Sequence, residues 1–248
     1  MISKAKIKHL KALQVKKYRK QEQCFVVEGT KSVIELIIAD YEVTWLAGTE
    51  QFLEEQERFL RNLKAEVVLA TATELAAAGS FKTNDGALAV ARMKANTSFT
   101  PDQNELVLVL DDIRDPGNLG TIIRTADWYG VKHIIASEES ADFYNPKTLS
   151  ATMGSFSRVE VFYTDIQMYL AKAGRPVYGA FLEGTDVHAI DFKAGGFIVI
   201  GNESNGISES IEKLVTQKIT IPRYGAAESL NAAIATGVIL DCVRNSKK

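Results

Sequence analysis

The sequence lacks the residues that metal sites and disulfide frameworks require. Its 248 residues include two cysteines, Cys24 and Cys242, which lie far apart and match no metal-ligand spacing. The three histidines, His9, His133 and His188, form no cluster along the chain. We therefore expect no metal site, and two reduced thiols in a cytoplasmic protein.

Long apolar runs are also missing. No stretch reaches the roughly 18 apolar residues that a membrane span needs, and residues 1–20 contain no signal-peptide core. Hydrophobic residues make up 46% of the chain and charged residues 24%, as in ordinary globular domains. The length is enough for one large domain or two of ordinary size, with no membrane partner.

Charge of one sign is concentrated at the start of the chain. The net charge of −2 excludes a protein that is basic throughout. Yet no acid precedes Glu22, and the preceding segment is rich in cations: Lys4, Lys6, Lys8, Lys11, Lys16, Lys17, Arg19 and Lys20. We predict a basic helix over residues 4–20, with Ile7, Leu10 and Leu13 on its docking side. Its charged face is either ordinary solvated surface or a contact for a polyanion.

The first half of the chain alternates strand-like and helix-like segments. Strands are predicted for CFVVEG, VTWLAGT, AEVVLAT and GALAVARM, and helices for TKSVIELIIAD and QFLEEQERFLRNL. This order indicates an α/β sandwich. The segment ANTSFTPDQN that follows is polar and aperiodic, which is typical of a linker.

The second half repeats the alternation with short apolar runs. These are ELVLVLDDI, HIIAS, VEVFY, PVYGAFLEG, FIVIGNE and KITIP. Runs of this kind predict a mostly parallel sheet covered on both faces, and hence a second α/β domain. We place the domains at 1–98 and 104–248.

Three of the predicted strands end in loops rich in glycine and polar residues. The loops contain DDIRDPGNLG, GNESNG and PRYGAAESLN. Parallel sheets bind ligands at the carboxyl ends of their strands, so each loop is a candidate for the site. None has the G-x-G-x-x-G or G-x-x-x-x-G-K-[ST] pattern, which argues against a dinucleotide or a P-loop phosphate.

A helix starting near Asn118 is predicted to have two distinct faces. Leu119, Ile122, Ile123 and Ala126 share the arc that packs on the sheet. Asn118, Thr121 and Thr125 lie on another side, next to Arg124 and Trp128. Without a functional role, Arg124 is a surface ion-pair partner and Trp128 a subunit contact.

The two other loops also have structural alternatives. Glu203 directly follows a buried-type strand and is either bound by a partner or an acid at the start of the next helix. Ser229 is a good candidate for the N-cap of the last helix.

Taken in order, the three loops resemble the motifs of a known family. D-P-G-N-L-G-x-I-x-R-T-A, then I-G-N-E-x-x-G, then I-P…E-S-L-N-A-A-x-A resemble the SpoU/TrmH RNA 2′-O-ribose methyltransferases of the SPOUT superfamily. CFVVEGTKSVIE and TNDGALAV resemble that family's RNA substrate-binding domain, similar to a ribosomal-protein α/β/α sandwich. Asp112 stands where members often have Asn, and Thr152 where Ser is common.

The resemblance implies a SPOUT domain with a deep trefoil knot, a homodimer, and S-adenosylmethionine as cofactor. Gly201, Ile221 and Leu230 would contact the cofactor. The catalytic candidates are Asn118, Arg124, Glu203, Ser229 and Asn231. Arg124 is expected to grip an RNA phosphate and stabilise the developing alkoxide, because a guanidinium stays protonated and is a poor base.

The implied substrate is RNA, with Lys8, Lys11, Lys16 and Lys17 as candidates for phosphate contact. The additional N-terminal domain favours large-subunit ribosomal RNA over transfer RNA. Two other functions remain as alternatives. One is a non-catalytic RNA-binding protein of the same fold, which predicts damaged motifs. The other is a nicotinamide-dependent dehydrogenase, which predicts the glycine pattern that is missing.

Overall fold

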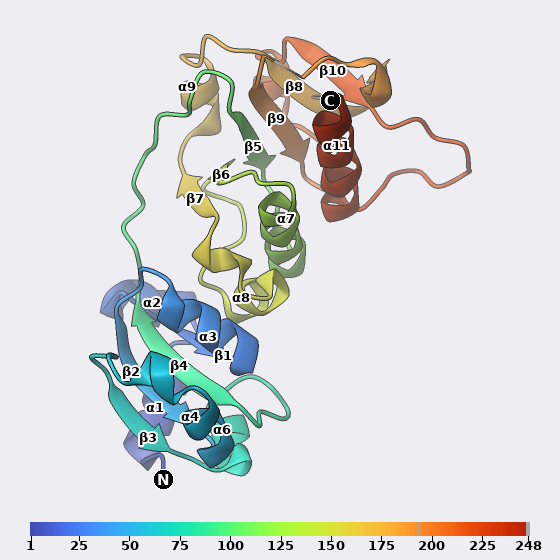
Figure 1. Ribbon diagram of the computed structural model, residues 1–248. Coiled ribbons are helices and arrows are strands. Elements are labelled where there is room, and N and C mark those ends of the chain that lie inside the picture. Colours follow the sequence, from blue (N-terminus) through green and yellow to red (C-terminus); the bar gives the residue numbers. More distant parts are fainter. Residues whose placement is uncertain (193, 247–248) are drawn as a thin grey trace. The chain divides into compact units, whose positions relative to one another are not determined.

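The computed structural model describes residues 1–192 and 194–246. The chain forms two compact units (Figure 1): the first contains Met1–Ala95 and Asp142–Ser157, and the second contains Asn96–Ala141 and the residues from Arg158 onward. The first crossing falls in the segment predicted as a linker. The segment 142–157 follows that linker in sequence and nevertheless packs with the first unit, so the chain passes between the units three times.

The first unit is built on a four-stranded sheet with the order β1-β4-β2-β3. Its strands are β1 (Cys24–Glu28), β2 (Val43–Gly48), β3 (Glu66–Leu69) and β4 (Ala87–Arg92). β4 is antiparallel to β1 and β2, whereas β2 and β3 are parallel. Its helical segments are α1 (Lys4–Ala12), α2 (Lys16–Glu22), α3 (Thr30–Ile38), α4 (Glu50–Glu55), α5 (Glu57–Leu60), α6 (Ala72–Ala78), α8 (Pro146–Thr152) and the 3-10 turn η1 (Ser155–Ser157). The four predicted strands are present, the helix predicted over 51–63 is divided into α4 and α5 at Gln56, and α6 was not predicted.

The prediction of one basic helix over residues 4–20 is wrong, because the chain breaks between α1 and α2. In a continuous helix the carbonyls of Leu13 and Gln14 would accept backbone N–H groups four residues on. Here both accept from Nη1 of Arg19, at 2.9 and 2.8 Å. Val15 is extended, and α2 begins directly after it.

Arg19 itself is buried, with 1% of its surface exposed, although it lies among exposed lysines. Its Nη2 donates to Oδ2 of Asp142 at 2.6 Å, across 123 residues of sequence. A buried charge needs such a partner, because removal from water costs several kcal/mol. The pair therefore attaches the segment 142–157 to the start of the chain.

Aromatic contacts add to this attachment. The ring of Tyr144 lies 4.6 Å from that of Phe25 on β1, measured between centroids. The hydroxyl of Tyr144 accepts from the backbone N–H of Lys94 at 2.8 Å. Tyr41 and Phe156 meet edge-on with centroids 6.0 Å apart. The segment thus completes the core of the first unit.

The second unit contains a six-stranded sheet with the order β10-β8-β9-β5-β6-β7. Its strands are β5 (Leu106–Asp111), β6 (His133–Ala136), β7 (Glu160–Tyr163), β8 (Val177–Asp186), β9 (Gly196–Gly201) and β10 (Gln217–Thr220). Every pair of neighbours is parallel, which confirms the predicted parallel α/β sheet. Its helical segments are α7 (Pro116–Trp128), α9 (Ile166–Leu170), α10 (Glu209–Glu212), α11 (Ala232–Ser246) and the 3-10 turn η2 (Val187–Ala189).

The central strands explain why their sequences are apolar throughout. All six residues of β5 are buried, and in β9 only Gly201, at its end, is partly exposed. Val107, Val109 and Val199 belong to one core cluster. Each buried side chain of this size contributes ~1.5–3 kcal/mol. The sheet therefore holds the loops at its carboxyl edge on a rigid base.

The structure describes no helix long and apolar enough to cross a membrane. The two cysteines are free thiols, with Cys24 buried and Cys242 partly buried. Burial raises the pKa of both thiols above the usual value, so neither is activated as a nucleophile.

The Arg19–Asp142 pair yields a stability prediction. Arg19→Met should lower the free energy of unfolding by about 3–5 kcal/mol, because it leaves a largely buried carboxylate without its cation. Urea titration measures the loss. The matched control is Arg61→Met, whose exposed partner Glu57 lies 3.1 Å away, and which should cost under about 0.5 kcal/mol. Equal losses in the two variants would contradict the role given to Arg19.

Candidate active site

Three loops of the second unit leave the same edge of the parallel sheet. β5 and β9 are neighbours in register, with Asp111 opposite Gly201, so the loops after them start side by side. The loop after β10 connects to α11 and projects from the unit in Figure 1. These are the loops that carry the three sequence motifs.

The side chain of Asn118 joins all three loops. Its Nδ2 donates to Oε1 of Glu203 at 2.5 Å. Its Oδ1 accepts from Nδ2 of Asn231 at 2.9 Å. Oδ1 of Asn231 in turn accepts from the backbone N–H of Ala233 at 2.9 Å. This directional chain links a carboxylate to the first turn of α11, and we call it the Asn118 relay.

Asn118 is held in place by the start of α7. Asp115 is the N-cap, and its side chain accepts from the backbone N–H of Asn118 at 2.9 Å. Pro116 follows at the first helical position, where it has no N–H to leave unpaired. As predicted, Leu119, Ile122, Ile123 and Ala126 are fully buried. Asn118 thus lies on a side of α7 that is not used for packing.

A second connection, between Asp112 and Asn202, was missed in the sequence. Nδ2 of Asn202 donates to the backbone carbonyl of Asp112 at 2.7 Å. Asp112 has a positive φ of 59°, and its Oδ1 accepts from Nε of Arg114 at 2.7 Å. Asp and Asn tolerate this backbone conformation better than most residues, so the Asp at position 112 was the feature of the sequence that could have indicated it. Asp112 therefore supports the residue directly before Glu203.

Gly201 is required by its own loop. A Cβ at this position would lie 2.2 Å from the backbone carbon of Gly206 and 2.3 Å from the nitrogen of Ile207. Asn202 and Gly206 also exchange backbone hydrogen bonds of 3.0 and 2.9 Å. The loop after β9 therefore folds back tightly over its own first residue.

The third loop holds Ile221, Ser229 and Leu230 less firmly. Ile221 is partly buried, and Leu230 is 48% exposed. Ser229 is exposed and is not the N-cap of α11, since Asn231 accepts from the N–H groups of that helix. The backbone of residues 222–230 forms no hydrogen bond with other described backbone groups. Nη1 of Arg223 donates to the carbonyl of Ala227 at 3.3 Å, and most of the other backbone groups of this segment are available to a ligand.

Arg124 stands apart from the Asn118 relay. It is exposed on α7, between Thr121 and Thr125. The hydroxyls of these threonines turn back to the carbonyls of Gly117 and Thr121, both at 2.8 Å. Trp128, one turn further along, is 85% exposed. This face of α7 therefore presents a large ring and a cation that has no hydrogen-bond or ion-pair partner among the described residues.

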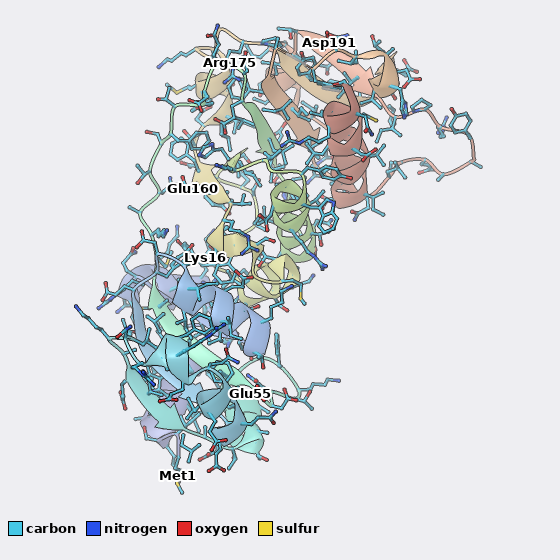
Figure 2. The ribbon with its side chains drawn as sticks, viewed as in Figure 1. Met1, Lys16, Glu55, Glu160, Arg175 and Asp191 are labelled. Carbon is cyan, nitrogen blue, oxygen red and sulfur yellow. The ribbon has the colours of Figure 1, made fainter. Side chains whose placement is uncertain are left out.

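The four lysines proposed for RNA contact lie in the first unit. Lys8 and Lys11 are on α1, and Lys16 (labelled in Figure 2) and Lys17 are on α2; all four are exposed. Of the three residues predicted on the docking side of this segment, Leu10 and Leu13 are buried in the core and Ile7 is partly buried against it. Across the described residues, no group of three or more His, Cys, Asp or Glu side chains could hold a metal ion.

Two protein-family models match this chain. Residues 105–241 match the SpoU rRNA Methylase family. The chain belongs to this family. Residues 4–89 match the MRM3-like substrate binding domain.

Individual relatives agree with this assignment. The 23S rRNA (guanosine(2553)-2′-O)-methyltransferase of Bacillus subtilis is 30% identical over 95% of this chain and 94% of its own length. A putative TrmH-family RNA methyltransferase from Porphyromonas gingivalis superposes with a TM-score of 0.84 at 36% identity, over 99% of each chain. The SpoU methyltransferase AviRb from Streptomyces viridochromogenes, solved with S-adenosylmethionine, gives a TM-score of 0.88 at 25% identity over 99% of each chain.

The Asn118 relay predicts how the site responds to charge. Asn118→Asp replaces the donor to Glu203 with a second carboxylate, so the pair should repel and raise the pKa of one carboxyl group. The free energy of unfolding of the variant at neutral pH should be about 1 kcal/mol lower, because a hydrogen bond is lost and two carboxylates repel each other. The loss should shrink as the pH falls through the raised pKa, because a protonated carboxyl can donate again.

A double variant provides the control. In Asn118→Asp with Glu203→Gln, the amide at 203 can donate to the new carboxylate, which still accepts from Asn231. Stability near that of the unchanged protein is expected, measured by thermal unfolding at several pH values. A double variant no better than Asn118→Asp would show that the relay contributes nothing.

Proposed function

We propose that this protein transfers a methyl group from S-adenosylmethionine to a ribose 2′-hydroxyl of RNA. The main structural support is the Asn118 relay, which joins the three motif loops at the carboxyl edge of the sheet. That edge is where parallel α/β sheets bind ligands. Membership of the SpoU rRNA Methylase family supports the reaction.

The cofactor fits the second and third loops. Adenine needs backbone donors and acceptors beside apolar walls. Residues 222–230, whose backbone forms no hydrogen bond with other described backbone groups, would supply the first, and Ile221 and Leu230 the second. Gly201 lies at the base of the neighbouring loop. When bound, S-adenosylmethionine supplies an activated methyl group on a sulfonium.

The residues around the cofactor would orient the reacting groups. Asn118 and Asn231 fix the carboxylate of Glu203 beside the two cofactor loops. Ser229 lies two residues before Asn231 and would complete this set. Arg124 would grip the phosphate beside the target ribose and stabilise the oxygen as it loses its proton. We assign no side chain as the base, because guanidinium does not accept protons in proteins.

Ribosomal RNA is the substrate class that we favour. The relative from B. subtilis is named for 23S rRNA, and residues 4–89 match a substrate-binding domain. The transfer-RNA alternative is weaker because a tRNA (guanosine(18)-2′-O)-methyltransferase from Aquifex aeolicus matches only 56% of this chain. The non-catalytic alternative predicts damaged motifs, and all five catalytic candidates are present. The trefoil knot and a cytoplasmic location remain predictions.

Arg124→Ala tests the reaction directly. Methyl transfer to RNA should fall about 100- to 1000-fold, the usual effect of removing one donor to a developing charge. Calorimetry with S-adenosylhomocysteine should show unchanged binding, and NAD should not bind. Lys172→Ala is the matched control, an exposed cation between α9 and β8 at the other edge of the sheet. Near-normal turnover in Arg124→Ala would refute the role of Arg124. Failure of the unchanged protein to bind S-adenosylhomocysteine would refute the proposed function.

We further propose that the protein is a homodimer that uses α7 and α11. These helices pack against each other. Trp128 on α7 and Ile234 on α11 are both exposed, and apolar side chains of this size are typical of interfaces. Trp128→Glu should convert the dimer to a monomer in light scattering at micromolar concentration. A monomeric, active unchanged protein would contradict the proposal.

A further inference from the structure

α2 has one buried side chain among outward-facing cations. Arg19 is fixed by its bonds to Leu13, Gln14 and Asp142. Lys16, Lys17 and Lys20 are exposed. Because one long side chain ties α2 both to the turn that precedes it and to Asp142, the orientation of the helix is set before any ligand arrives.

Tyr18 is the aromatic residue on this outer surface. It is 40% exposed and makes no ring contact with another described aromatic or cationic side chain. By contrast, the ring of Trp45 is buried in the core, and the Lys6 nitrogen lies 4.6 Å from its centroid. Tyr18 therefore offers a ring to a partner from outside.

The charge around Tyr18 indicates a polyanion. No acid occurs in residues 1–21. Glu22 is the acid on α2 itself, and its Oε2 is bound to Nε2 of His9 at 2.6 Å. Three exposed lysines on so short a helix leave its outer surface net positive, and Lys17 directly precedes Tyr18.

We propose that α2 is a platform for an unpaired nucleotide of the RNA substrate, with Tyr18 stacking on the base and Lys16, Lys17 and Lys20 contacting phosphates. The inference rests on the proposed function, since it takes RNA as the substrate. Stacking on an aromatic side chain is how proteins recognise bases in single-stranded loops. A paired base is already stacked in its helix, so Tyr18 should discriminate against a duplex.

The lysines and the ring should have separable effects. Each phosphate contact releases counterions, and affinity for a single strand falls with salt by a slope of roughly 0.7 per contact. Stacking carries no net charge and leaves that slope unchanged. Phosphate contacts alone would instead give equal preference for single strands and duplexes.

The full-length protein can be tested with a short oligoadenylate that carries 2-aminopurine, and with the same strand annealed to its complement. The unchanged protein should quench the single-stranded probe and prefer it to the duplex. Tyr18→Leu should weaken single-strand binding about five- to hundredfold, abolish the quench and keep the salt slope. Tyr18→Phe, which retains the ring, should behave like the unchanged protein. Lys17→Gln should lower the slope by about 0.7 and keep the quench.

Two results would overturn the proposal: unchanged single-strand affinity and quench in Tyr18→Leu, or an equal loss of single-strand and duplex binding. Thermal unfolding of Tyr18→Leu excludes misfolding as the cause. Calorimetry with S-adenosylhomocysteine separates this proposal from the proposed function. A protein that binds S-adenosylhomocysteine but shows no Tyr18-dependent RNA binding keeps the methyltransferase assignment and loses the platform. A protein that binds RNA through Tyr18 but does not bind S-adenosylhomocysteine supports the platform and contradicts the proposed methyl transfer.

Discussion

The functional half of this protein depends on one amide side chain. Asn118 donates to Glu203 and accepts from Asn231, so it carries one contact of each polarity. A carboxylate cannot donate in its place, and an aliphatic side chain can do neither. The amide therefore fixes two loops that are separated from α7 by 85 and 113 residues in sequence. The rigid sheet places the loops near one another, and the amide sets their final relation.

The same arrangement explains why the third loop can remain open. Asn231 ends that loop and is held at both its amide nitrogen and its amide oxygen. Residues 222–230 are anchored between this point and the end of β10 without backbone pairing of their own. A segment of this kind can present its amides to a cofactor with little rearrangement of the sheet. The loop is fixed at its ends by β10 and Asn231, whereas the backbone without such bonds belongs to the residues between them.

The first unit depends on a different kind of contact, a buried ion pair. Arg19 and Asp142 bring a segment from the middle of the chain into the N-terminal unit. Within this segment, the ring of Tyr144 contacts Phe25 and the ring of Phe156 contacts Tyr41. The unit that carries the basic surface is thus covalently continuous with β6 and β7 through residues 142–157. Removing this segment would leave Arg19 as an unpaired buried charge.

The sequence by itself determined what depends on local periodicity. The buried face of α7 follows from helical spacing, the parallel strands from continuous apolar runs, and the three loops from the polar residues that end those runs. Tertiary structure alone decided the break before α2, the burial of Arg19, the cap at Asn231 rather than Ser229, and the need for glycine at 201. Each of these depends on a partner outside the local pattern, from the folded-back loop beside Gly201 to an aspartate 123 residues from Arg19. Periodicity records which side of an element is buried, but it does not record which distant group meets it there.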